Sequence, residues 1–297
     1  MESTFINSFR SFLDSSYIQF NEYGNSFFFP DNNFIIHLVP APKMGCKDEC
    51  EEEERYLQGG DDVLYLYEDR WWGARAMVQE RILTRLERFT SIFARKCKVL
   101  SGLNNPVLAE KVANFLKENH SYSSTKCRYR FALEYEDKIV AVATFSEPRP
   151  MVRNLEQPLS NVPKENVEHL DSSNVVIFDS YEWIRYASLP GVRVVGGMGR
   201  ILSAFIEERV SRKDNPLRPV EVMTYSDNEW GNGGVYLKLG FKYASDREPV
   251  EHYVNKESNI RYSIKEYSKL IAEGALEKDF YRIKNKGSRK FLLQLPL

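Results

Sequence analysis

The sequence has few cysteines, no long apolar run and no excess of charge of either sign. Four cysteines in 297 residues are too few for a secreted disulfide scaffold, so a reducing, intracellular compartment, most simply the cytoplasm, is expected. No apolar run approaches the ~20 residues that cross a bilayer, which argues against a membrane partner. With 41 basic and 42 acidic residues, the formal net charge is −1, so no overall field favours a nucleic acid or an anionic membrane.

Metal binding and organelle targeting receive little support. Cys46 and Cys50 lie four residues apart, but no second Cys or His pair follows at a zinc-binding spacing, so no metal site is predicted. The Ser and Phe content of residues 3–16 leaves an organelle-targeting peptide as an alternative to a cytoplasmic protein.

The composition is that of a folded protein, with 42% hydrophobic and 13% aromatic residues, enough for a sizeable core. Four parts are expected along the chain. They are an irregular N-terminal extension (1–60), a strand and amphipathic helix that pack on the core (61–95), a main domain (96–255), and a C-terminal helix and strand (256–297).

Hydrophobic periodicity gives the expected elements. Apolar residues recur at three- and four-residue intervals from Val78 to Phe93, which predicts a helix over residues 74–94. Two β-rich runs, 128–135 and 138–145, flank a two-residue acidic turn and predict a hairpin. Residues 146–172 contain four prolines and predict a flap or mobile loop. Further strands are expected at 63–67, 98–100, 174–178, 181–187, 220–225 and 291–295, and further helices after Asn105, after Gly199, before Gly240 and around 262–271.

A glycine-rich turn formed by Gly196, Gly197 and Gly199 lies between a strand and a helix. Backbone N–H groups at a helix start bind anionic oxygen, and glycine permits close approach. The alternative is that these glycines serve only a tight turn. The segment lacks the Gly-Lys-Ser/Thr of a nucleotide P-loop and the G-x-G-x-x-G spacing of dinucleotide sites. It therefore favours a phosphate-bearing cofactor of another kind.

One strand further on, residues 236–241 read Tyr-Leu-Lys-Leu-Gly-Phe. The glycine turn followed by this segment resembles the GNAT superfamily of acyl-CoA-dependent N-acyltransferases, which carries a glycine-rich pyrophosphate loop and then a Tyr-x-Lys-x-Gly-Phe helix end. The resemblance covers residues 95–255. It implies an α+β fold with a mixed sheet in the order strand, helix, hairpin, strand, glycine loop, helix, strand, helix and strand, here with N- and C-terminal extensions.

The resemblance also implies an activity, the transfer of an acetyl group from acetyl-CoA to an amine by direct attack. Such a reaction needs a base for the amine proton and an acid for the departing thiolate. The family pattern places the base at Glu182 and the acid at Tyr236. The alternatives are an edge-strand carboxylate paired with Arg185 or a lysine, and a tyrosine that only fills the core.

Cofactor contacts follow from the same resemblance. The amides of Val194 and Val195 would polarise the thioester carbonyl, the glycine turn would hold the pyrophosphate, and Asn228 would contact the pantetheine arm. The family loop begins with Arg or Gln, a place that falls on Val194, while Arg193 stands one residue early. The cofactor-binding residues implied are Val194, Val195, Gly196, Gly197, Met198, Gly199, Arg200 and Asn228.

The acceptor is an amine-bearing molecule of unknown type. His120 ends the first helix of the main domain on the acceptor side, where Arg185 is also expected. His120 is a candidate second base, or a histidine that stabilises the dipole of a helix C-terminus.

A narrower resemblance offers an alternative function. A phage GNAT-like group, which includes Mom-type DNA-modification proteins and domains appended to homing endonucleases, is similar to this chain at residues 181–187, 194–197, 224–227, 233–241 and 281–285. This resemblance implies a nucleic-acid-binding or base-modifying protein on the same fold. Residues 70–98 hold eight Lys/Arg against two Asp/Glu, and residues 256–290 hold ten against five. Nucleic acid is therefore a possible partner, although solvated helix faces give the same pattern.

Overall fold

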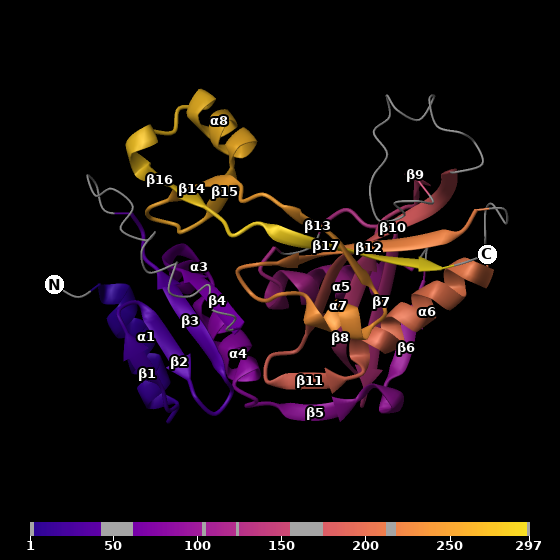
Figure 1. Ribbon diagram of the computed structural model, residues 1–297, viewed down its shortest axis with the longest axis horizontal. Coiled ribbons are helices and arrows are strands. Elements are labelled where there is room, and N and C mark those ends of the chain that lie inside the picture. The colour runs from indigo at the N-terminus through magenta and orange to yellow at the C-terminus, as the bar shows by residue number, and fades with distance from the viewer. Residues whose placement is uncertain are drawn as a thin grey trace. The chain divides into compact units, whose positions relative to one another are not determined.

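The computed structural model describes residues 3–42, 62–102, 105–122, 125–154, 175–211 and 218–295 (Figure 1). These residues belong to two compact units. Cys46, Cys50 and the acidic run expected to be a linker lie outside the described residues. The first unit comprises Met1–Val78, Ser226–Gly233 and Asp246–Arg289, and the second comprises Gln79–Tyr225, Gly234–Ser245 and Lys290–Leu297.

The first unit contains a four-stranded sheet in the order β1-β2-β3-β4, in which β3 and β4 run parallel. Helix α1 buries Phe5, Phe9 and Leu13, and the Phe9 ring lies 5.4 Å from that of Trp71. The elements of this unit are α1 (Thr4–Ser15), β1 (Asn21–Tyr23), β2 (Ser26–Phe29), β3 (Phe34–Val39), β4 (Asp62–Tyr67), α3 (Glu68–Gly73), β14 (Glu251–Asn255), β15 (Arg261–Ser263), α8 (Ile264–Ala272), a 3₁₀ turn (Glu277–Asp279) and β16 (Phe280–Lys284).

The expectation of an irregular extension over residues 1–60 is wrong for residues 4–39, which form α1 and three strands. The strands are three to six residues long, so each carries too little alternation to be recognised. The expected strand at 63–67 and the expected helix near 262–271 are present as β4 and α8. A capping box between Ser263 and Glu266 fixes the start of α8.

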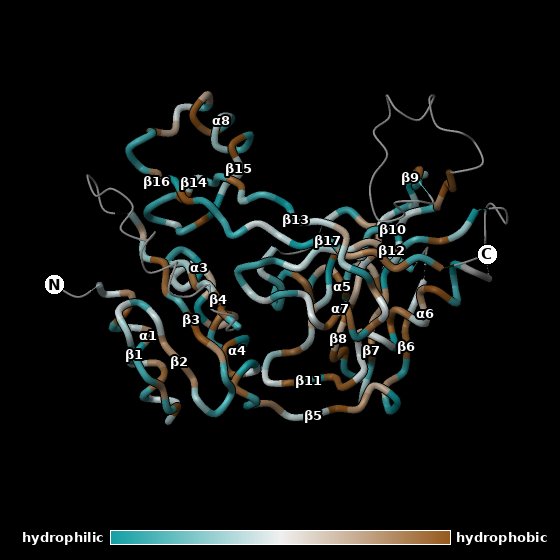
Figure 2. Tube along the Cα trace, in the orientation of Figure 1, coloured by the Kyte–Doolittle hydropathy of each residue, from teal (hydrophilic) through white to brown (hydrophobic). Residues whose placement is uncertain are grey.

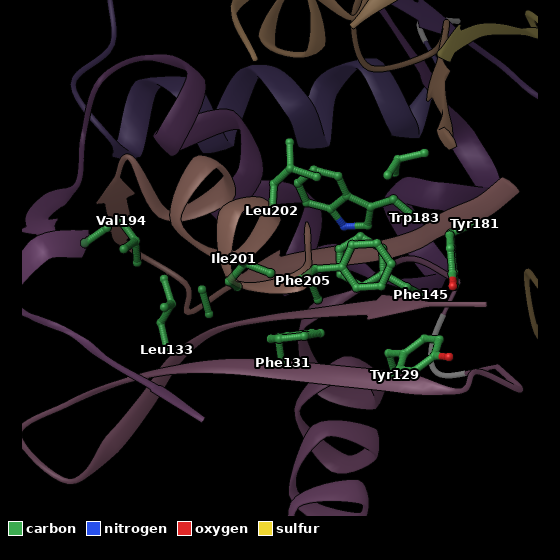
Figure 3. Close-up of a cluster of buried hydrophobic side chains, with 14 of the residues drawn as sticks. Tyr129, Phe131, Leu133, Phe145, Tyr181, Trp183, Val194, Ile201, Leu202 and Phe205 are labelled. Atoms are coloured by element: carbon green, nitrogen blue, oxygen red, sulfur yellow. The ribbon is translucent and has the colours of Figure 1, made fainter. Parts of the chain in front are cut away.

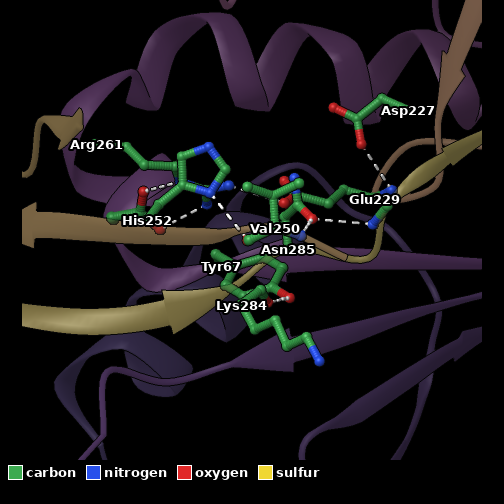
Figure 4. Close-up of polar contacts among 10 residues, drawn as sticks. Tyr67, Asp227, Glu229, Val250, His252, Arg261, Lys284 and Asn285 are labelled. Carbon is green, nitrogen blue, oxygen red and sulfur yellow. Dashed lines mark hydrogen bonds and ion pairs between the residues drawn. The ribbon is translucent and has the colours of Figure 1, made fainter. Parts of the chain in front are cut away.

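A buried ion cluster ties distant segments of the first unit together (Figure 4). Arg261 donates to Asp69 (2.9 Å) and to Glu229 (2.8 Å), and all three side chains are almost fully buried. Burial raises the pKa of Glu229, an effect that the charge of Arg261 only partly offsets. The cluster holds residues 226–233 through Glu229, whose carbonyl also accepts from the Tyr65 amide (2.8 Å).

The second unit is built on an eight-stranded mixed sheet in the order β13-β17-β12-β10-β8-β7-β6, with β9 paired to β10. Helices α5 and α6 supply the apolar residues that pack on the sheet. The elements are α4 (Arg75–Arg85), β5 (Thr90–Phe93), a 3₁₀ turn (Ala94–Lys96), β6 (Lys98–Ser101), α5 (Pro106–Asn119), β7 (Tyr129–Tyr135), β8 (Lys138–Phe145), β9 (Arg149–Asn154), β10 (Val175–Ser188), β11 (Val192–Val195), α6 (Gly197–Ser211), β12 (Val220–Asp227), α7 (Gly234–Lys238), β13 (Lys242–Arg247) and β17 (Ser288–Leu295), of which α4, β12, β13 and β17 run from one unit into the other.

The order of these elements confirms the α+β class and the expected succession, to which the structure adds β9 and β11. Strand β6 leads to α5, the β7–β8 hairpin, β10, the glycine turn, α6, β12, α7 and β13. The Asn105 side chain caps α5 by accepting from the Leu108 amide (3.0 Å). Glu136 and Asp137 turn the hairpin with φ of 49° and 60°, as a two-residue turn between right-twisted strands requires.

Each face of the sheet has its own core. On the α6 face, Phe145 and Phe205 stack with ring centroids 3.9 Å apart (Figure 3). On the other face, Leu108 and Leu116 of α5 pack with Ala187 of β10. The central strands of this sheet are among the hydrophobic parts of the chain trace (Figure 2). Strand β10 contributes to both cores, with Tyr181 and Trp183 on the α6 face and Ala187 on the α5 face.

The helix expected over residues 74–94 is shorter than predicted. It ends at Arg85, and Glu87 takes a left-handed conformation with φ of 60°. The Arg88 amide donates to the Leu83 carbonyl (2.9 Å), which closes a Schellman motif. Residues 90–93 then form β5, parallel to β11, so Phe89 and Phe93 continue the apolar spacing by coincidence and not as part of the helix.

Two expectations around β10 also change. The separate strands expected at 174–178 and 181–187 are one strand, Val175–Ser188. Within the expected flap at 146–172, residues 149–154 form β9, which pairs antiparallel with β10. Residues 155–172 lie outside the described residues.

Candidate functional site

The parallel strands β10 and β12 part in the middle of the sheet. Their pairing runs from Asp179 opposite Val220 to Glu182 opposite Met223. Beyond that point both strands continue, and β10 pairs with β8 from Trp183 onward. The register shifts between Trp183 and Arg185, which marks a β-bulge. We call this place, where the β10–β12 pairing ends, the strand split.

A side chain joins the two strands just past the split. The Thr224 hydroxyl of β12 donates to the Trp183 carbonyl of β10 (3.2 Å). Thr224 is almost fully buried and also hydrogen-bonds the Tyr236 hydroxyl. Beyond the split, the Thr224 side chain thus replaces backbone pairing between the strands and also connects β12 to α7.

The glycine turn precedes α6 in the same unit. Gly196 has a φ of +76°, a conformation that glycine adopts without strain. The Arg200 amide donates to the Gly196 carbonyl (2.9 Å) and begins the helical hydrogen bonds. The amides of Gly197, Met198 and Gly199 precede that bond and have no acceptor within the helix. Their N–H groups and the helix dipole make this end of α6 suited to an anion.

Tyr186 of β10 lies against the glycine turn. A Cβ on Gly197 would stand 2.7 Å from the Tyr186 hydroxyl and 3.0 Å from Val194 side-chain atoms. Burial raises the pKa of Tyr186, so its hydroxyl keeps its proton. The ring of Tyr186 meets that of Trp183 edge-on at 6.2 Å. The turn is thereby in contact with the strand that carries the split.

Tyr236 of α7 completes this group. Its ring lies 6.1 Å from that of Trp183 and 5.5 Å from that of Phe291. Burial raises the pKa of Tyr236, and the hydrogen bond to Thr224 only partly offsets the effect. The phenol is therefore neutral at physiological pH and can act as a proton donor. The glycine turn, Trp183 and Tyr236 all lie on the α6 face of the sheet.

Glu182 lies on the opposite face of β10. Its neighbours Tyr181 and Trp183 are both buried in the α6 core, and successive side chains of a strand point to opposite sides. The Glu182 amide donates to the Ser146 hydroxyl, and the Ser146 amide donates to the Glu182 carbonyl, both at 2.9 Å. These bonds fix the backbone of Glu182 while its side chain remains half-exposed.

A buried ion pair lies beside Glu182 on that face. Ser180, two residues earlier on β10, donates to Glu221 (2.6 Å), which also accepts from Arg153 (2.6 Å). Burial by itself would raise the pKa of Glu221, but the bonds from Arg153 and Ser180 hold it below its usual value. The pair anchors β9 to β12 next to the split.

On this face, β10 approaches the segment that follows α5. The bulge brings Arg185 to the α5 face, where its guanidinium lies 5.5 Å from the Tyr122 ring centroid. Burial lowers the pKa of Arg185, and the charge of Glu182 opposes this shift. His120 lies close enough to Arg185 for its own pKa to be lowered by that charge. Arg185 therefore interacts electrostatically with Glu182 and with His120, the two other residues predicted from the sequence for this side.

Other predicted residues lie differently. Val194 and Val195 are in β11, with Val194 buried in the α6 core and Val195 exposed. Asn228 belongs to the first unit, where its side-chain amide donates to the Lys286 carbonyl (3.0 Å). Arg193 is exposed and stacks on Phe89 at 5.2 Å.

The basic residue in the first turn of α6 is Arg200, which is exposed. It follows the glycine turn, whereas the basic residue of the family loop precedes it. The cation nearest in sequence to the amides of Gly197, Met198 and Gly199 thus belongs to the helix itself.

Sequence reasoning missed Thr224, Tyr186, Ser146 and Tyr122. Thr224 and Tyr186 belong to segments 224–227 and 181–187 of the narrower resemblance, but no spacing rule marks a threonine or a tyrosine on a strand as part of a site. Ser146 and Tyr122 belong to the ends of other elements and meet the site only through the sheet and helix packing.

Within the ranges that the structure describes, no group of three or more His, Cys, Asp or Glu side chains could hold a metal ion. Among the helices described, none is long and apolar enough to cross a bilayer.

Comparison with known proteins gives matches among solved structures. No protein-family model matches the chain, and no curated protein matches it. An acetyltransferase from Bacillus subtilis in complex with CoA is 11% identical, with a TM-score of 0.32, over 68% of this chain and 100% of its own. A GNAT family acetyltransferase from Elizabethkingia anophelis with acetyl-CoA bound is 12% identical, with a TM-score of 0.34, over 67% of this chain and 99% of its own.

A polyamine N-acetyltransferase from Drosophila melanogaster is 10% identical, with a TM-score of 0.33, over 67% of this chain and 100% of its own. The three matched structures are acetyltransferases, and one of them is described as a member of the GNAT family.

Proposed function

We propose that this chain is an acyl-CoA-dependent N-acyltransferase that moves an acetyl group from acetyl-CoA to an amine. The observation that carries the proposal is the strand split. At this place β10 presents Trp183 and Tyr186, with the glycine turn and Tyr236, on one face, and presents Glu182 on the other. A donor held on the α6 face and an acceptor on the α5 face would meet where the two strands part.

The glycine turn suits the diphosphate of acetyl-CoA. Three amides at the start of α6 have no helical acceptor, and Gly197 leaves no side chain over them. Arg200 adds an exposed positive charge in the same turn. Charge-assisted bonds from amides and a guanidinium to phosphate oxygens are among the stronger hydrogen bonds in proteins. The amide of Val195, immediately before the turn, remains a candidate for the thioester carbonyl.

Bound acetyl-CoA would supply a thioester carbonyl that a neutral amine can attack. Glu182 would then take a proton from the attacking nitrogen, directly or through water, as the C–N bond forms. Tyr236 would donate its hydroxyl proton toward the departing sulfur as the C–S bond breaks, and would regain a proton from solvent. No covalent enzyme intermediate is required.

Binding of the donor can be tested before any acceptor is known. The purified full-length protein would be titrated calorimetrically with acetyl-CoA and with CoA. We expect micromolar dissociation constants for both, because the diphosphate that the glycine turn would bind is common to both ligands. Arg200→Glu reverses a charge at the anion site and should weaken binding about tenfold or more.

Arg193→Glu is the matched control. It also reverses an exposed charge, but the Arg193 side chain stacks on Phe89, so its effect should be clearly smaller. Absence of binding by the wild-type protein would refute the proposal. Equal weakening by both variants would mean that general charge and not the helix start attracts the ligand.

A further inference from the structure

Three consecutive residues after α5 lie between two arginines that come from other elements. Arg81 of α4 donates to the Ser121 hydroxyl (2.7 Å), and Arg185 of β10 lies over the Tyr122 ring. His120 lies within electrostatic reach of both arginines. We call Arg81, His120, Tyr122 and Arg185 the acceptor-side cluster, because Arg185 shares its face of β10 with Glu182.

The hydrogen bonding of His120 fixes its tautomer. The Tyr122 backbone amide donates to Nδ1 of His120 (3.1 Å). A backbone N–H can only donate, so Nδ1 is the acceptor and Nε2 carries the hydrogen of the neutral ring. Burial, with the charges of Arg185 and Arg81, lowers the pKa of His120 to about 3. The ring is therefore neutral at physiological pH and presents an N–H at Nε2.

This arrangement does not suit a second base. Nδ1 already accepts a hydrogen bond from the Tyr122 amide, and Nε2 already carries a proton. The charges of Arg81 and Arg185 disfavour a second proton on the ring. The ring can instead donate a hydrogen bond. The cluster thus contains two guanidinium groups and one imidazole N–H, and Arg185 lies within electrostatic reach of Glu182.

Such a set of donors matches an oxyanion. Guanidinium groups bind carboxylate and phosphate oxygens with paired, charge-assisted hydrogen bonds. A second ammonium group on the acceptor would instead meet two positive charges at this place. Glu182 would remain available to the amine that reacts.

We propose that the acceptor is a small molecule that carries a carboxylate or phosphate group near its amine, and that Arg81, Arg185 and the Nε2 hydrogen of His120 bind this oxyanion. The assignment of the bound molecule as an acetyl acceptor rests on the proposed function, whereas the oxyanion site does not. Two experiments separate the two claims.

The first experiment observes His120 without catalysis. The full-length protein, labelled with ¹⁵N-histidine, has four histidines, and His120→Gln assigns the signal. We expect the Nε2–H tautomer with no titration between pH 5 and 8. Sodium phosphate or sodium glutamate, added at constant ionic strength, should shift this signal. Arg81→Gln should weaken the response about tenfold, and Lys117→Gln, which removes an exposed charge from the end of α5, should leave it unchanged.

The second experiment compares matched amines as acceptors of acetyl from acetyl-CoA. The pairs are 4-aminobutyrate against butylamine and phosphoethanolamine against ethanolamine, with putrescine as a dication. We expect kcat/KM to favour the anionic member on the order of 10- to 100-fold, as for one charged hydrogen bond. Arg81→Gln should remove most of this preference, and the stronger of the two pairs tells carboxylate from phosphate.

The outcomes are distinct. A shift of the His120 signal by anions without acetylation of any amine would retain the oxyanion site and reject the proposed function. Acetylation of butylamine or putrescine at least as fast as of the anionic amines, with no shift of the His120 signal, would retain the function and overturn the oxyanion site. An Nδ1–H tautomer would also overturn it.

Discussion

The hydroxyl of Tyr186 lies 2.7 Å from the position that a Cβ would take on Gly197. Real Cβ contacts are longer, so a side chain at position 197 requires Tyr186 or the turn to move. The glycine is therefore fixed by packing within the protein as well as suited to a ligand. This relationship couples β10 to the start of α6.

Replacement of Gly197 should show this coupling. Gly197→Ala should lower the free energy of unfolding by about 1–3 kcal/mol, the usual cost of overpacking. Tyr186→Phe removes the hydroxyl and should recover part of that loss, but only part, since Val194 atoms also lie close. Urea unfolding of the two single variants and the double variant would give the coupling energy. Strictly additive effects would show that the hydroxyl does not restrict position 197.

Tyr236→Phe should separate binding from catalysis. The ring contacts with Trp183 and Phe291 are kept and only the hydroxyl is lost. We expect acetyl-CoA affinity near that of the wild type and a kcat lower by about 10²–10⁴, the usual contribution of an acid–base group. The measurement is release of the CoA thiol with a saturating acceptor.

The pH profile gives a second check on Tyr236. Because burial raises its pKa above the ordinary value of 10.0, the protonated form persists across the neutral and mildly alkaline range. At pH values below about 10, deprotonation of Tyr236 should therefore not reduce kcat. A Tyr236→Phe variant with wild-type turnover would mean that the tyrosine serves packing alone.

Glu182→Gln should impair proton removal from the acceptor. The backbone bonds with Ser146 do not involve the side chain, so the fold should be retained. We expect kcat/KM to fall about 10²–10⁴-fold at pH 7 and to recover as pH rises, because the free amine then loses its proton to solvent. Glu147→Gln removes an exposed carboxylate nearby and should change neither quantity. A pH-independent loss in Glu182→Gln would point to a structural role.

The α+β class and much of the main domain could be predicted because their signals are local. The Asn105 cap, the acidic hairpin turn and the glycines before α6 each specify an element through neighbouring residues. The end of α4 could not be predicted, because Glu87 takes a left-handed conformation that sequence does not favour, and the apolar spacing continues into β5.

The candidate site was predictable only where a motif marks it. Glu182 and Tyr236 follow from the family pattern, but the place of Arg185 on the same face as Glu182 depends on the bulge after Trp183. The protonation of His120 depends on Arg81 and Arg185, which come from distant parts of the chain. No spacing rule encodes either fact.

His120 should also give the protein a specific pH dependence of stability. Its folded pKa of about 3 lies below the ordinary 6.5, so between these values the unfolded chain binds the extra proton. Stability is therefore fully present above pH 6.5 and is lost as pH falls toward 3. Between pH 7.5 and 5 the contribution is at most about 2 kcal/mol, and solvent screening reduces it.

The check is the difference in the free energy of unfolding between the wild type and His120→Gln at the two pH values. The wild type should lose more stability on acidification than the variant. Parallel losses would show that His120 titrates normally in the folded protein.

Amide hydrogen exchange can locate bound acetyl-CoA without an acceptor, so it examines the proposed donor site itself. With saturating acetyl-CoA, we expect exchange to be at least about tenfold slower in a peptide that covers residues 196–201. A peptide from α5 should exchange at an unchanged rate. If acetyl-CoA binds and protects other segments but leaves residues 196–201 unchanged, the glycine turn is not the donor site.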